Sequence, residues 1–316
     1  MTDPSTPVAA LRRTWREAPR ADRVAYVVAA VLFASGVVHV AVLLVTGRTW
    51  LGPLSLRKAA TFGLSFGLTL ASVTWATSFL AMRLRPRTAL LGAFTVACVV
   101  EVVLVTMQAW RGVPSHFNFE TPVDTAVSMT LAIGGGVIVV TALGFTGAAF
   151  RASRAATPSM RLSIRYGLLV FLVALGDGAA MIADGVRTSR TDPELAYTTA
   201  GALKPIHAVA MHAILVVPGL AFLLRFARWP ERRRLAVVGL GAVAYSLLLI
   251  VVAVETLVGI EPIAAPAAGT IASLLALVLL GVAGLIALVG VRAPRRTAAL
   301  PGAVQHPGER VERGRA

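Results

Sequence analysis

The chain has 316 residues, of which 57% are hydrophobic and 14% are charged, and its formal net charge is +15. Its mean hydropathy of +0.77 is far above the range of soluble domains, so the composition excludes a soluble enzyme and predicts a polytopic membrane protein. A nucleic-acid-binding module is also excluded, because the arginines lie at the ends of apolar runs, where they face anionic lipid.

Eight apolar runs of about 20 residues, each long enough to cross a bilayer, follow one another along the chain. They lie at 24–46, 58–82, 88–110, 125–150, 163–186, 206–227, 234–258 and 264–290. The runs are continuous and rich in Ala, Leu and Val, which favours helices over barrel strands. We therefore predict an all-α transmembrane bundle of about eight spans, in a domain over residues 24–290.

The two ends of the chain are predicted to be tails outside the membrane. Residues 1–23 form a basic tail, and residues 291–316, rich in Arg, Pro and Gly, are predicted to be disordered. Most of the 30 Lys and Arg residues lie in these tails and in the even-numbered connections. Since basic residues favour the cytoplasmic side, both termini are predicted to be cytoplasmic, in a cytoplasmic or plasma membrane.

A weak internal symmetry suggests two halves of four spans each. Lys58 and Lys204 both begin the second span of a half, and Glu101 and Glu255 lie in the outer part of the third. Because each half has an even number of spans, such repeats would be parallel, related by an axis along the membrane normal.

Four ionisable residues on four different spans lie at one predicted depth, roughly 10 to 14 Å below the outer surface at about 1.5 Å per helical residue. They are His39, Glu101, Asp177 and His212. Charges in hydrocarbon are costly, so each is a candidate functional residue. We predict that all four bind zinc or iron, or that the two histidines ligate haem axially. The alternative is an ion pair of a carboxylate with a protonated histidine.

A shallower polar layer lies above them and includes the connection QAWRGVPSHFNFETPVD, residues 108–124, which we predict to be the lid of an outward-facing site. Glu101 and Asp177 are also predicted to be catalytic proton acceptors, with His116 and His207 as proton shuttles. Side chains predicted to attract an anionic, small-molecule or lipid-like substrate are Lys58, Gln108, Arg111 and Lys204. The two lysines could instead extend toward lipid headgroups.

These residues predict a metal- or haem-dependent enzyme or redox protein with an extracytoplasmic site. A proton-coupled transporter of a small or anionic solute is the alternative, and an accessory membrane subunit is a third possibility.

Two further sequence patterns predict structure and no function. The stretch from Gly63 to Gly67, GLSFG, indicates close helix packing, and the spacing of Asp184 and Arg187 allows an ion pair.

Overall fold

The computed structural model describes residues 7–47, 49–50, 52, 54–151, 156–199, 203–260 and 265–292. This part of the chain forms ten helices and no strands. The helices are α1 (Pro7–Glu17), α2 (Arg20–Thr46), α3 (Arg57–Thr77), α4 (Leu84–Arg111), α5 (Pro122–Ala149), α6 (Pro158–Ser189), α7 (Pro193–Thr199), α8 (Lys204–Leu224), α9 (Glu231–Leu257) and α10 (Ala267–Arg292).

Within the described residues, every helix except α1 and α7 is long and apolar enough to cross a membrane, which gives eight candidate spans. They coincide with the eight predicted runs, so the predicted all-α polytopic bundle is confirmed. The predicted N-terminal tail contains α1 and the first turn of α2, and residues 293–316 of the predicted C-terminal tail lie outside the described residues.

Local sequence signals set several helix boundaries. Thr121 and Thr157 cap the N-termini of α5 and α6, where each hydroxyl accepts a backbone N–H, and a proline follows each threonine. Gly47 and Gly112 end α2 and α4 with positive φ angles of 62° and 69°. Glycine adopts this left-handed conformation without the steric cost that a Cβ atom imposes.

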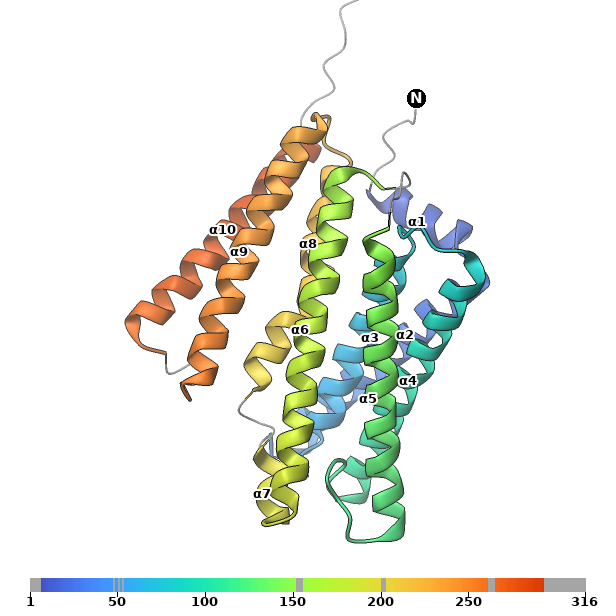
Figure 1. Cartoon of the computed structure of the whole chain (residues 1–316), viewed down its shortest axis with the longest axis vertical. Coiled ribbons are helices and arrows are strands. Elements are labelled where there is room, and N and C mark those ends of the chain that lie inside the picture. The colour runs from blue at the N-terminus through green and yellow to red at the C-terminus, as the bar shows by residue number, and fades with distance from the viewer. Residues whose placement is uncertain are drawn as a thin grey trace, which may run out of the picture.

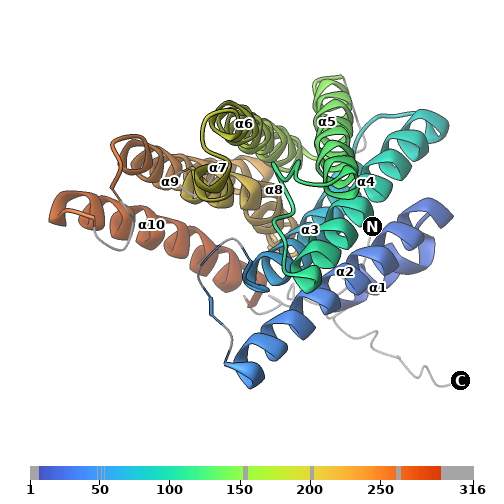
Figure 2. The same ribbon diagram turned by 90° about the horizontal axis from the view of Figure 1, so that it is seen from below.

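The spans run alternately up and down (Figure 1). We call the end of the bundle that holds α1 the α1 end, and the opposite end, which holds α7 and the α4–α5 connection, the α7 end. Figure 2 shows α3 and α8 in the middle of the bundle, with α2 and α4 beside α3 and with α9 and α10 beside α8. These two central helices have the largest buried share of all the spans.

Helices α2 and α3 approach each other closely along a line of glycines. A Cβ atom added to Gly63 would lie 2.5 Å from the backbone nitrogen of Gly36, and one added to Gly67 would lie 2.6 Å from that of Phe33. Only glycine permits these backbone distances, as in other small-residue interfaces of membrane helices. The close packing predicted from GLSFG is therefore confirmed.

The middle of the bundle is filled with large apolar side chains. Leu70, Phe94, Phe145 and Phe171 are 0–1% exposed and belong to one continuous core cluster. The rings of Phe94 on α4 and Phe171 on α6 meet edge to face, with their centroids 6.5 Å apart. We call these four side chains the apolar layer; they belong to the hydrophobic core between the two ends of the bundle.

Candidate functional site

The four predicted metal ligands lie on α2, α4, α6 and α8. Among the described residues, no group of three or more His, Cys, Asp or Glu side chains could hold a metal ion. His39 Nδ1 lies 2.7 Å from the Ser35 carbonyl oxygen, and its Nε2 accepts a hydrogen bond of 3.0 Å from Trp110. In this arrangement both nitrogens of His39 are in hydrogen bonds, so neither has a free lone pair for a metal ion or a haem iron.

His212 lies on an exposed face of α8, and its Nδ1 is 2.6 Å from the Ala208 carbonyl oxygen one turn earlier. On the neighbouring α6, Asp177 Oδ2 is 3.9 Å from His207 Nδ1, and this buried oxygen has no hydrogen-bond partner among the described residues. His207 Nδ1 is also 2.8 Å from the carbonyl oxygen of Ala174. The structure thus places the predicted shuttle His207 beside the predicted proton acceptor Asp177.

A second polar group joins α3 to the connection that follows α4. Lys58 Nζ lies 3.2 Å from His116 Nδ1, and Ser115 Oγ lies 3.0 Å from the same nitrogen. A lysine ammonium has no lone pair, so it can only donate, and Nδ1 must accept. The contact therefore favours a neutral His116 that carries its proton on Nε2.

Glu101 lies deeper in the bundle on α4 and is 4% exposed. Lys58 is the charged group that interacts with this carboxyl group, and no described residue donates a hydrogen bond to it. A Cβ atom at Gly134 of α5 would lie 2.9 Å from Glu101 Oε1, so glycine at that position leaves room for the carboxyl group. A buried carboxyl group that interacts with an ammonium group can bind and release a proton.

Three cations gather at the α7 end, where α3 and α8 both begin. Lys58 interacts electrostatically with Lys204, and Lys204 interacts with Arg57. Arg57 Nε is buried and has no hydrogen-bond partner among the described residues. Helices α3 and α8 both begin with these residues, so the positive ends of their dipoles lie at the α7 end. We call Arg57, Lys58 and Lys204 the cation cluster; it is suited to an anion.

The base of the predicted lid is fixed by a carboxylate that the sequence prediction did not single out. Asp124 Oδ1 pairs with Arg111 at 2.7 Å and accepts a hydrogen bond of 2.9 Å from Gln108, while Oδ2 accepts one of 2.6 Å from Thr121. Arg111 also donates to Gln108 Oε1. Gln108 and Arg111, the two residues of this group that were predicted to bind substrate, thus join α4 to α5.

The lid itself is held by buried contacts. Asn118 is fully buried; its backbone nitrogen donates to Ser128 of α5, and its side chain accepts from the backbone nitrogen of Glu120. Phe117 has a φ of 60°, rare for a residue with a Cβ atom, and its ring occupies the space next to Gly185 of α6. The connection predicted to be a lid therefore packs onto both α5 and α6.

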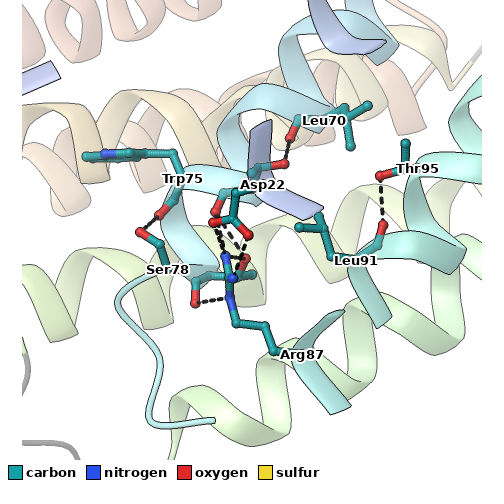
Figure 3. A network of polar contacts seen from close by, with 9 residues as sticks. Asp22, Leu70, Trp75, Ser78, Arg87, Leu91 and Thr95 are labelled. Atoms are coloured by element: carbon teal, nitrogen blue, oxygen red, sulfur yellow. Dashed lines mark hydrogen bonds and ion pairs between the residues drawn. The ribbon is translucent and has the colours of Figure 1, made fainter. Parts of the chain in front are cut away.

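Sequence reasoning missed a buried charge network at the α1 end (Figure 3). Arg87 of α4 forms two hydrogen bonds of 2.7 and 2.9 Å with Asp22 of α2. It also donates to the carbonyl oxygens of Thr74 and Thr77 at the end of α3. Asp22 and Arg87 each stand just before an apolar run, and at such positions the sequence alone indicates ordinary charges at the membrane interface.

The ion pair predicted between Asp184 and Arg187 is present, and it is exposed.

Comparisons of the chain with protein-family models, with curated proteins and with solved structures gave no match.

His116 gives the site a pH dependence that can be measured. Burial, followed by the charge of Lys58, lowers the pKa of His116 well below its ordinary value of 6.5. We expect ¹⁵N-histidine NMR to show a neutral His116, protonated on Nε2, at pH 6, and Lys58→Met to raise its pKa. A His116 signal that titrates near pH 6.5 in the wild type would contradict the observed contact.

The same pKa shift predicts how stability depends on pH. The unfolded chain binds a proton at His116 at a higher pH than the folded chain does. This contribution to the free energy of unfolding is therefore fully present above pH 6.5 and declines as the pH falls below that value. Thermal unfolding in detergent between pH 7.5 and 5 checks the sign, with His116→Gln expected to lose less stability over that range.

Proposed function

We propose that this chain is a proton-coupled carrier of a small anionic solute, with its binding site at the α7 end. The observation that carries the proposal is the cation cluster above the buried carboxyl group of Glu101. The cations would attract the anion, and Glu101 would bind the proton that accompanies it. His116, which contacts Lys58, would transfer that proton between Glu101 and the surface.

The geometry supports a carrier better than a cofactor enzyme. Both nitrogens of His39 are in hydrogen bonds, and the carboxylates and histidines at the predicted depth are not grouped as metal ligands among the described residues. A carrier needs only charged groups that bind and release ions. The apolar layer between the two ends would then be the barrier that conformational change must open.

We also propose that the α7 end faces the extracytoplasmic side. The α1 end carries the arginine-rich segments before α4 and around the start of α9, and basic residues favour the cytoplasmic side. In this orientation the anion and the proton would enter beneath the lid.

Reconstituted vesicles test the proposed activity. The purified protein is placed in liposomes that contain the pH-sensitive dye pyranine, and an inward gradient of chloride, nitrate, phosphate, sulfate, acetate or succinate is applied. We expect at least one anion to acidify the interior, and Lys58→Met to reduce the initial rate by roughly tenfold or more because a charge-assisted contact is lost.

Arg190→Gln is the matched control, because Arg190 is an exposed cation at the same end, outside the cation cluster. It is expected to keep the wild-type rate. Vesicles that show no acidification with any of these anions, or a Lys58→Met variant as fast as the wild type, would contradict the proposal.

A further inference from the structure

A pocket of about 810 Å³ lies at the α1 end, on the opposite side of the apolar layer from the cation cluster. Its walls come from α1, the first turn of α2, the segment after α3, the N-cap of α6, the α8–α9 connection and α9. This volume is within the range of pockets that hold small ligands. None of the side chains predicted from the sequence to act in function lines it.

Positive charge dominates this pocket. The four arginines in its wall are Arg13, Arg225, Arg228 and Arg234. Only two carboxylates share the wall, Glu17 and Asp22, and both oxygens of Asp22 already accept from Arg87. The pocket therefore holds more guanidinium groups than carboxylates can neutralise, and it is suited to an anion.

Several of these guanidinium groups have no anionic partner. Among the described residues, no carboxylate lies within ion-pair distance of Arg13, Arg225 or Arg228. Arg225 lies over the ring of Phe79, 5.8 Å from its centre, so an aromatic face supports the guanidinium plane and leaves its edge free to donate.

Arg234 is paired with a carboxylate of its own helix, since its Nη1 lies 3.7 Å from Glu231 Oε2. One of its terminal nitrogens donates to the Ala227 carbonyl oxygen at 2.8 Å, while its Nε is buried and has no hydrogen-bond partner in the described part of the chain. Burial, followed by the charges of Arg13 and Arg234, lowers the pKa of Arg225 below its usual value. These cations repel one another, and a bound anion would relieve that repulsion.

We propose that this pocket binds the phosphate group of an anionic ligand, with Arg13, Arg225 and Arg228 donating to its oxygens. Guanidinium forks match phosphate oxygens, and the pocket opens at the end of a membrane bundle, where lipid headgroups lie. The phosphate can belong to an anionic phospholipid or to a soluble ion. The inference does not depend on the proposed carrier activity, because it concerns the other end of the molecule.

Thermal unfolding of the full chain in a non-ionic detergent tests the inference. Three probes are titrated separately: phosphatidylglycerol, zwitterionic phosphatidylcholine and inorganic phosphate. We expect the first or the third to raise the unfolding midpoint of the wild type, and phosphatidylcholine to leave it unchanged. Stabilisation by phosphatidylglycerol alone identifies a headgroup site, whereas stabilisation by inorganic phosphate identifies a site for soluble phosphate.

Paired variants assign the effect to the pocket. Arg225→Gln/Arg228→Gln is expected to raise the half-saturating probe concentration by roughly tenfold or more. Arg83→Gln/Arg85→Gln removes the same charge from exposed positions of the same end outside the pocket, and should leave that concentration unchanged. Absence of stabilisation by both anionic probes, or an equal loss in the two paired variants, would overturn the inference.

Discussion

Replacing Arg87 by methionine is expected to lower the free energy of unfolding by about 3–5 kcal/mol. The variant leaves the Asp22 carboxylate, which is 3% exposed, without the two hydrogen bonds that now satisfy it. The carbonyl oxygens of Thr74 and Thr77 also lose one donor each at the end of α3, although Thr77 Oγ1 still donates to the first and the Leu80 backbone nitrogen to the second. Unfolding in mixed micelles of increasing SDS content, followed by circular dichroism, measures the change.

The physical cause is the unpaired charge, and a second variant isolates it. Asp22→Leu/Arg87→Met removes both charges, so it should recover much of the stability that Arg87→Met loses. Arg187→Met is the exposed control: Arg187 also pairs with an aspartate, Asp184, but its side chain is 83% exposed, and the expected loss is about 0–1 kcal/mol. Similar losses for Arg87→Met and Arg187→Met would refute a stabilising role for the buried network.

The second large effect is expected at the α2–α3 interface. Gly63→Ala adds a methyl group 2.5 Å from the backbone nitrogen of Gly36 and 2.9 Å from the carbonyl oxygen of Leu32. Neither backbone atom can move aside without separating the two helices. We expect a loss of about 1–3 kcal/mol in the free energy of unfolding, because overpacking displaces backbone.

Gly92→Ala is the matched control for this change. Gly92 also lies inside a membrane-spanning helix, but a Cβ atom there meets nothing within 4 Å. Since alanine favours helix over glycine, this variant should be as stable as the wild type or up to about 1 kcal/mol more stable. If both variants shift stability in the same direction by the same amount, the close approach of α2 and α3 does not matter for folding.

The fold was predictable because the bilayer imposes a simple rule on sequence. An apolar run of about 20 residues must be a helix, since no water is present to satisfy an open backbone. The eight spans and the glycine contacts at Gly63 and Gly67 follow from composition and small-residue spacing. Helix α1 was missed because basic residues interrupt its short apolar stripe, so that its sequence resembles that of a solvated tail.

The site was only partly predictable, because depth along a helix says nothing about the direction in which a side chain points. Glu101 interacts electrostatically with Lys58, which was predicted to lie in the shallower layer, whereas His39 and His212, predicted at the depth of Glu101, are in separate local contacts. The partner of Arg87 could not be foreseen, because Asp22 is 65 residues away and its pairing depends on how α2 and α4 pack.

The measurement that tests the central claim most directly is the coupling of anion and proton movement in Glu101→Gln. Vesicles with this variant are loaded with pyranine, and uptake of the transported anion is quantified beside the internal pH. Because glutamine cannot bind the proton, we expect anion uptake to persist without acidification, while the wild type moves both. Acidification in Glu101→Gln at the wild-type ratio of protons to anions would contradict a proton-binding role for Glu101 and with it the proposed carrier mechanism.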